Sequence, residues 1–145
     1  MKIQQIAIFM ENKPGHLRTI CRTLADANIS ITTLSLADTQ QYGILRLLTD
    51  NCDKARDVLS QAGFVVNVTE VLAVEVDDKP GGLLRILDII GESGINIEYM
   101  YAFTFHRGEN AVMVFRFDDP DKAIAMLQAR DVRVLSNIEI LKGAW

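Results

Sequence analysis

The sequence has few cysteines and histidines, from which many catalytic and metal-binding centres are built. Its 145 residues include only two cysteines and two histidines. The cysteines, Cys21 and Cys52, lie far apart and match no CxxC or metal-ligand spacing. We therefore expect no metal, no cofactor and no disulfide, and we assign Cys21 to the apolar face of a helix. Because no Ser/His/Asp or Cys/His set is present either, we expect the protein not to be an enzyme.

Long hydrophobic runs are also absent. No stretch approaches the roughly 18 consecutive apolar residues that a membrane-spanning helix needs. The first residues, Met1–Gln5, do not form the apolar segment that a secretory signal peptide carries. We therefore expect a cytoplasmic protein without a membrane partner.

The sequence lacks a cluster of basic residues as well. Its formal net charge is −4, and its Lys and Arg residues are scattered along the chain. Nucleic-acid binding needs a concentrated basic surface that meets the phosphates, so we expect no nucleic-acid partner. By contrast, hydrophobic residues make up 49% of the chain, which is enough to build a substantial core.

What the sequence does contain is one turn that occurs twice. Asn12–Leu17 and Asp78–Leu83 each place Pro-Gly between an alternating apolar run and apolar residues at helical spacing. When the two turns are aligned, Ile86 corresponds to Ile20, and the later segments match as well. Each copy reads strand-helix-strand-strand-helix-strand. This predicts an α+β fold of two tandem ferredoxin-like βαββαβ units, with antiparallel sheets and the helices on one face.

The repeat also suggests boundaries, at residues 1–68 and 69–145. The fourth strand of the first copy begins at Phe64–Val66, and the next strand, Val68–Val76, follows almost at once. We expect two strands with little linker between them. The only tryptophan, Trp145, ends a tail that either covers an apolar patch or a partner, or is a loose end.

Two asparagines mark the expected ends of the first helix. Asn12 precedes it and is expected to cap its amides, since Asn is a favourable cap residue. Asn28 follows it and is expected to end it, because Asn tolerates the left-handed conformation of a helix C-terminus.

Other ferredoxin-like proteins fit the sequence poorly. An RNA-recognition module places aromatic residues on its central strands, whereas Val71–Val76 has none, and strand periodicity predicts burial of Phe115 and Phe117. A metal chaperone would need CxxC in the first turn, and an acylphosphatase-like enzyme would need an arginine there. Both turns have Pro-Gly instead.

The Pro-Gly turns offer backbone rather than side chains. Gly15 and Gly81–Gly82 leave amides uncovered at a helix N-terminus, and such amides can bind a small anion such as a carboxylate. Asn12 and Asp78 are placed to accept hydrogen bonds from the loop. His16 is either a ligand contact or a solvated residue at the helix start. The turns are also explained simply as favourable helix starts.

The segment Asp78-Lys79-Pro80-Gly81-Gly82-Leu83, followed by Gly94-Ile95-Asn96-Ile97, resembles the ACT-domain family of regulatory amino-acid-binding modules. The resemblance extends over nearly the whole chain as two copies. It implies that two domains pack side by side, with an amino acid between the Pro-Gly turn of one and the early second strand of its neighbour. The ligand-binding residues it implies are Asp78, Gly81, Gly82, Leu83, Asn96 and Ile97 in the second copy, and Asn12, Gly15, His16, Leu17, Asn28, Ile29, Ser30 and Ile31 in the first.

The first copy departs from the family pattern, with Asn12 in place of Asp, Asn28 in place of Gly and Ser30 in place of Asn. One full-strength site and one altered site would follow. The sequence thus predicts an amino-acid-sensing regulatory protein, expected to be a homodimer, that modulates a partner or its own assembly. Two alternatives stay open: a non-catalytic regulatory subunit of an amino-acid biosynthetic enzyme, and a purely structural dimerisation module.

Overall fold

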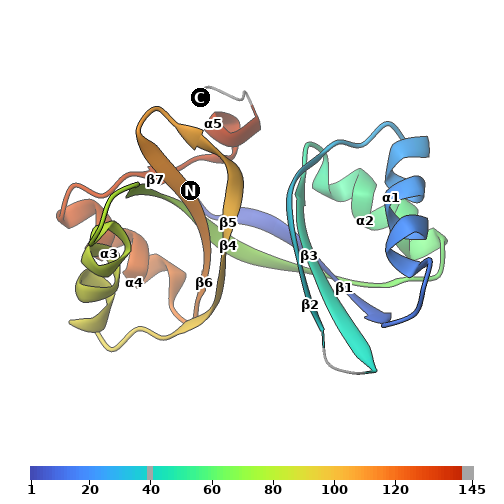
Figure 1. The fold of residues 1–145 in the computed structure, drawn as a ribbon, viewed down its shortest axis with the longest axis horizontal. Coiled ribbons are helices and arrows are strands. Elements are labelled where there is room, and N and C mark those ends of the chain that lie inside the picture. Colours follow the sequence, from blue (N-terminus) through green and yellow to red (C-terminus); the bar gives the residue numbers. More distant parts are fainter. Residues whose placement is uncertain (39–40, 142–145) are drawn as a thin grey trace. The chain divides into compact units, whose positions relative to one another are not determined.

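The structure is a computed structural model that describes residues 1–38 and 41–141, with side chains except at 38 and 104–107. The tip of the first hairpin and the tail that carries Trp145 lie outside the described residues. The chain divides into two compact units. We call Gln4–Thr69 the N-terminal unit, and Glu70 onward together with Met1–Ile3 the C-terminal unit. In each unit the helices cover one face of a sheet (Figure 1).

The N-terminal unit is a βαββαβ arrangement. Its strands lie in the order β2-β3-β1-β4, and β1 and β2 both pair antiparallel to β3. Its elements are β1 (Ile3–Glu11), α1 (His16–Asp26), β2 (Ile31–Asp38), β3 (Tyr42–Thr49), α2 (Cys52–Gln61) and the first part of β4 (Val65–Asp77).

The C-terminal unit repeats this arrangement. Its strands lie in the order β7-β4-β6-β5, and the pairs are again antiparallel. After β4 its elements are α3 (Gly82–Gly91), β5 (Ile97–Arg107), β6 (Asn110–Phe117), α4 (Pro120–Ala129), β7 (Val134–Leu135) and the short α5 (Asn137–Leu141). The predicted fold class is confirmed.

The link between the two copies differs from the prediction. Instead of two strands, β4 is one strand of 13 residues that belongs to both units. Near its start, Thr69 accepts a hydrogen bond from the Gln5 side chain of β1 at 3.1 Å. Farther along, Leu72–Asp77 pairs with β6. The interpretation as two strands was wrong because β-branched residues recur through Val65–Val76 and no Gly or Pro interrupts them.

Each unit has its own core between helices and sheet. In the N-terminal unit, alternation along β1 turns Ile6 and Ile8 toward Ile20 and Leu24 of α1, and all four are at most 1% exposed. Each such side chain contributes about 1.5–3 kcal/mol of burial free energy. The C-terminal core is built likewise from α3, α4, β4 and β6.

The aromatic residues of β6 belong to this second core. Phe115 and Phe117 are 0% and 1% exposed, and their rings stack with centroids 5.3 Å apart. Their predicted burial is confirmed, so these two rings do not form a platform for base stacking. In the described part of the chain, no helix has both the length and the apolar character that crossing a membrane requires.

The helix ends test the capping predictions. Asn28 has a φ of 56° after α1, as predicted. The prediction that Asn12 caps α1 was wrong. The residue before the helix is Gly15, which forms no side-chain cap, and the Asn12 amide instead donates to the Gln41 carbonyl at 3.0 Å. Lys13 and Pro14 separate Asn12 from the N-cap position, which Gly15 occupies.

Candidate functional site: the two Pro-Gly turns

The turn between β4 and α3 is fixed by backbone hydrogen bonds. The Lys79 amide donates to the Asp77 carbonyl at 2.9 Å, and the Gly82 amide donates to the Lys79 carbonyl at 3.0 Å. Gly81 then adopts the left-handed conformation, with φ 86° and ψ −5°. Because a side chain destabilises this conformation, glycine suits the position. The turn therefore directs the first amides of α3 outward.

Three amides at this turn make no backbone hydrogen bond in the described part of the chain. Among the described residues, no backbone carbonyl accepts from the amides of Gly81, Leu83 or Leu84. This is the usual state of the first turn of a helix, where the helix dipole also favours negative charge. Chemically, the turn can donate several hydrogen bonds to one carboxylate.

The turn between β1 and α1 has the same backbone path. The Lys13 amide donates to the Glu11 carbonyl at 2.8 Å, and the His16 amide donates to the Lys13 carbonyl at 3.3 Å. Gly15 has φ 90° and ψ −14°. The Lys13 ammonium hydrogen-bonds the Glu11 carboxylate and lowers its pKa below the usual value. This charge pair lies at the end of the strand that leads into the turn.

The residue after the left-handed glycine distinguishes the two turns. In the C-terminal unit it is Gly82, which is buried, and a Cβ there would lie 1.9 Å from the Asp77 carbonyl oxygen. In the N-terminal unit the corresponding residue is His16, which is half-buried. The start of α3 is thus packed against the end of its strand so closely that only glycine fits.

The predicted residues at the start of the second strand are also held by backbone hydrogen bonds. The Asn96 amide donates to Asp118 Oδ1 at 3.0 Å, and the Asp118 amide donates to the Asn96 carbonyl at 3.2 Å. Ser30 and Asp50 make the same two contacts at 3.0 and 3.2 Å. Sequence reasoning did not assign this role to the two aspartates, although their matching positions in the repeat were a usable signal. Ile29 is buried, whereas Ile31 and Ile97 are half-buried.

Within one unit the turn and the strand start are not brought together. The turn precedes α3, and Asn96 and Ile97 follow it. A helix of 10 residues separates them, which corresponds to about 15 Å at 1.5 Å per residue. A single unit therefore presents the two predicted halves of a site at opposite ends. A site that uses both needs a second domain.

A hollow of about 330 Å³ lies beside the second turn. Its charged residues include Lys79 and three acidic side chains, so an ammonium group suits it electrostatically. The lining residues are Asp77, Asp78, Lys79, Glu109 and Asn110. Amides for a carboxylate and an acidic hollow for an ammonium group thus occur at the same turn.

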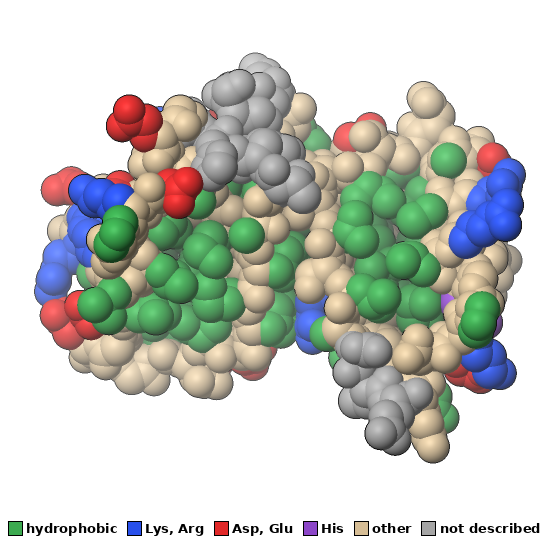
Figure 2. Space-filling view, viewed as in Figure 1, with side chains coloured by type: hydrophobic (Ala, Val, Ile, Leu, Met, Phe, Trp, Pro, Cys, Tyr) green, Lys and Arg blue, Asp and Glu red, His purple; other side chains and the backbone are tan. Residues whose placement is uncertain are grey.

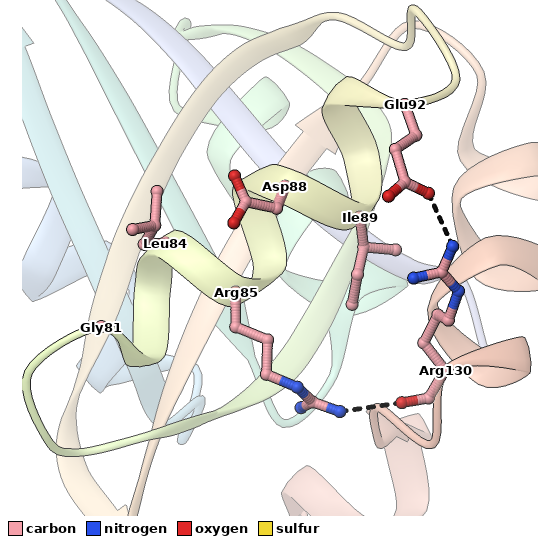
Figure 3. Close-up of a pocket in the computed structure, with 7 residues that line it drawn as sticks. All are labelled: Gly81, Leu84, Arg85, Asp88, Ile89, Glu92 and Arg130. Atoms are coloured by element: carbon pink, nitrogen blue, oxygen red, sulfur yellow. Dashed lines mark hydrogen bonds and ion pairs between the residues drawn. The ribbon is translucent and has the colours of Figure 1, made fainter.

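A second hollow, of about 350 Å³, lies between α3 and the end of α4 (Figure 3). Its arginines are already occupied. Arg85 donates to the Arg130 carbonyl at 2.8 Å, and the Arg130 guanidinium donates to Glu92 at 2.6 Å. Because both are bound within the protein, they are poorly placed to bind a ligand carboxylate. The contacts instead join α3 to α4.

The cysteines are not part of the turns. Burial raises the pKa of the Cys52 thiol, and neighbouring Asp53 adds to this effect. Cys21 is half-buried and lines a hollow on α1 with two arginines. The assignment of Cys21 to the apolar, core-facing side of α1 was wrong, because the residue lies at the flank of the helix beside these arginines. In the described residues, no three His, Cys, Asp or Glu side chains are grouped to hold a metal ion.

Comparison with known proteins identifies the family of the chain. Residues 1–142 match the family model of the ACT domain pair. The chain is an ACT domain pair. The predicted family is therefore confirmed. The ACT pair is also similar to the crystal structure of protein BT0572 from Bacteroides thetaiotaomicron, with 34% sequence identity and a TM-score of 0.91. The match covers 98% of this chain and 97% of that one.

The ACT pair shares its fold with regulatory subunits of aspartate kinase. The ligand-free subunit from Thermus thermophilus has 18% identity and a TM-score of 0.61, over 88% of this chain and 90% of that one. The subunit from Thermus flavus has 16% identity and a TM-score of 0.60, over 87% and 88%. None of the curated proteins compared with the ACT pair matches it.

Proposed function

We propose that this ACT pair, with domains at residues 1–68 and 69–145, is a cytoplasmic, non-catalytic regulatory protein that binds a free amino acid. The supporting observation is the turn Asp78–Leu83, whose outward amides lie beside an acidic hollow. Family membership supports the regulatory role. Amino-acid binding then modulates a partner or the assembly of the protein itself.

In the proposed complex the amides of Gly81, Leu83 and Leu84 donate to the ligand carboxylate. Asp78, which is exposed in the hollow, attracts the ligand ammonium group. These contacts recognise the groups common to all amino acids, so selectivity comes from residues around the ligand side chain. The strand-start residues Asn96 and Ile97 contribute from another domain, which a second copy of the chain supplies in a homodimer.

The two turns are proposed to bind unequally. After its left-handed glycine the second turn has Gly82, which carries no side chain, whereas the first turn has His16 at that place. The first turn also has Asn12 in place of the charged Asp78 and lacks its ionic attraction for an ammonium group. The site of the first copy, which adds Leu17 and Asn28–Ile31, is expected to be weaker.

A thermal-shift screen tests amino-acid binding. Each of the twenty amino acids is added at millimolar concentration. A true ligand stabilises the native state by mass action, by about 2.7 kcal/mol at a concentration 100 times its Kd. Asp78→Ala should remove most of the shift, and the matched Asn12→Ala variant should retain it. If no amino acid raises the melting temperature, the binding proposal is wrong.

A regulatory subunit of an amino-acid biosynthetic enzyme is a second candidate. It is supported by the fold shared with aspartate kinase regulatory subunits, one of which matches over 90% of its length. Affinity purification of the tagged protein from its source cells, with and without the ligand found above, tests this proposal. A co-purifying enzyme whose activity the amino acid alters supports it. Ligand binding without an associated enzyme excludes it. A stable dimer that binds none of the twenty amino acids favours a structural module.

A further inference from the structure

Arg116 of β6 connects three strands of the C-terminal unit. On the visible face of each unit, charged side chains lie mostly at the margins, around a group of hydrophobic ones (Figure 2). The Arg116 side chain, by contrast, is only 28% exposed. Its Nε donates to Glu98 Oε2 of β5 at 3.2 Å, and its Nη1 donates to the Glu70 carbonyl of β4 at 2.7 Å. One guanidinium group thus joins β5, β6 and β4.

Glu98 is the extra residue of a β-bulge at the start of β5. Ile97 pairs with Phe117 of β6. Tyr99 pairs with the adjacent residue, Arg116, which leaves Glu98 between them without a partner in the ladder. A bulge bends its strand and turns the neighbouring side chains in a new direction. By holding Glu98, Arg116 fixes this bend directly beside Ile97, which belongs to the proposed ligand site.

The other end of the contact is anchored as well. The Glu70 carboxylate lies 3.6 Å from the Lys2 ammonium group. Lys2 also pairs at 3.3 Å with Asp121, in the first turn of α4. All of these residues belong to the C-terminal unit. Arg116 therefore ties the bulge to a point of the same unit that is itself held from two sides.

The first copy has a bulge at the same place but a different neighbour. Its extra residue is Thr32 of β2, which corresponds to Glu98 in the repeat. The residue of β3 that corresponds to Arg116 is Leu48, which is buried. A leucine side chain can donate no hydrogen bond, so Leu48 cannot hold the first bulge in this way.

We infer that Arg116 is a positioning residue, which holds the start of β5 in the geometry that presents Asn96 and Ile97 to a ligand. The inference rests on the proposed function and deepens it, because Arg116 lies outside the predicted site. A group that is already held in place costs less to order when a ligand binds. The charge-assisted contact of the second copy is thus a further reason for the proposed inequality of the two sites.

Amide hydrogen exchange, followed by NMR without added amino acid, tests the positioning. Arg116→Leu copies the first unit at this place, and Glu98→Thr removes the contact with the bulge alone. Both variants should speed the exchange of the Asn96 amide by at least about fivefold, because local opening of the strand start becomes easier. The Ile89 amide of α3 should stay within about twofold, because the effect of a positioning residue is local.

Three results of this experiment would overturn the inference. Equal acceleration at Ile89 would show that Arg116 merely stabilises the unit as a whole. Acceleration by Arg116→Leu but not by Glu98→Thr would show that it does not act through the bulge. An Asn96 amide that is unprotected in the wild type, or unchanged in both variants, would show that the strand start is not held by this contact.

Binding gives a second readout. The amino acid with the largest effect in the thermal-shift screen is titrated by calorimetry into the wild type, Arg116→Leu and Arg22→Leu. Arg116→Leu should weaken binding by at least about fivefold, because the strand start must then be ordered by the ligand. The control Arg22→Leu removes the same charge from an exposed position of α1 and should bind within about twofold of the wild type.

Equal affinity of Arg116→Leu and the wild type would overturn the inference while leaving the proposed function intact. If no amino acid binds the wild type, the proposed function is wrong, and the exchange experiment still decides whether Arg116 positions the start of β5. The two failures are therefore distinguishable.

Discussion

The two Pro-Gly turns follow the same backbone path but tolerate different residues. Gly15 and Gly81 have nearly equal dihedral angles, and three backbone hydrogen bonds around each of them correspond. At the next position the first turn has His16. In the second turn the Asp77 carbonyl lies so close to Gly82 that a side chain would not fit there. The two copies thus share the backbone conformation of the turn. The packing distance between the helix start and the strand end differs between the two units.

This difference matters for the proposed binding. A glycine after the left-handed residue adds no side-chain atoms to the turn. A histidine adds a bulky group and a hydrogen-bonding ring at the same place. Two turns that appear equivalent in the fold are therefore expected to differ both in stability and in ligand affinity.

The largest expected effect comes from Gly82→Ala compared with His16→Ala. The new methyl group at 82 would lie 1.9 Å from the Asp77 carbonyl oxygen, so the helix must move away from its strand. We expect a loss of about 3 kcal/mol or more in the free energy of unfolding. His16→Ala should cost less than about 1 kcal/mol. Urea denaturation measures both, and equal losses would refute the proposed difference in packing.

A smaller and equal effect is expected at the preceding glycines. Gly15→Ala and Gly81→Ala both place a side chain on a left-handed residue, with nothing within 4 Å of the new Cβ. Only backbone strain opposes them, so each should cost about 1–2 kcal/mol. The same denaturation experiment applies. A loss at Gly81 much greater than at Gly15 would show that the second turn is constrained by more than its backbone angles.

Much of the fold could be predicted from the sequence because its signals are local. Alternation along the strands and the helical stripe at Ile20 and Leu24 identified the elements, and the repeat identified the two units. The Asn28 conformation and the burial of Phe115 and Phe117 also followed from residue type and spacing. Each depends on a few neighbouring residues.

The features that could not be predicted depend on contacts between residues far apart in the chain and on packing distances. The closeness of Gly82 to the Asp77 carbonyl is a packing distance that no periodicity encodes. The separation of turn and strand start to opposite ends of α3 follows from topology. The Asp118 contact with Asn96 joins residues far apart in the chain. By contrast, α5 had a readable signal, because Ser136 and Glu139 have the spacing of a capping box.

The smallest effect concerns this last helix, which follows β7 in the C-terminal unit, whereas the N-terminal unit continues directly into β4. Glu139 accepts from the Ser136 amide at 2.7 Å and also pairs with Arg133. These contacts lower its pKa from 4.5 to about 2. Because the folded state holds the carboxylate charged, the stabilisation is complete above the unfolded value of 4.5 and is lost as the pH falls toward 2.

Glu139→Gln should therefore flatten the fall in melting temperature over this acidic range. We expect no more than about 1 kcal/mol, since the side chain lies at the surface and solvent screens its charge. Arg133→Gln is the matched control. The Ser136 amide is the larger cause of the lowered pKa, so this variant should keep most of the pH dependence. If Glu139→Gln melts with the same pH profile as the wild type, the capping box does not stabilise the C-terminal unit, and the two units differ only at their turns.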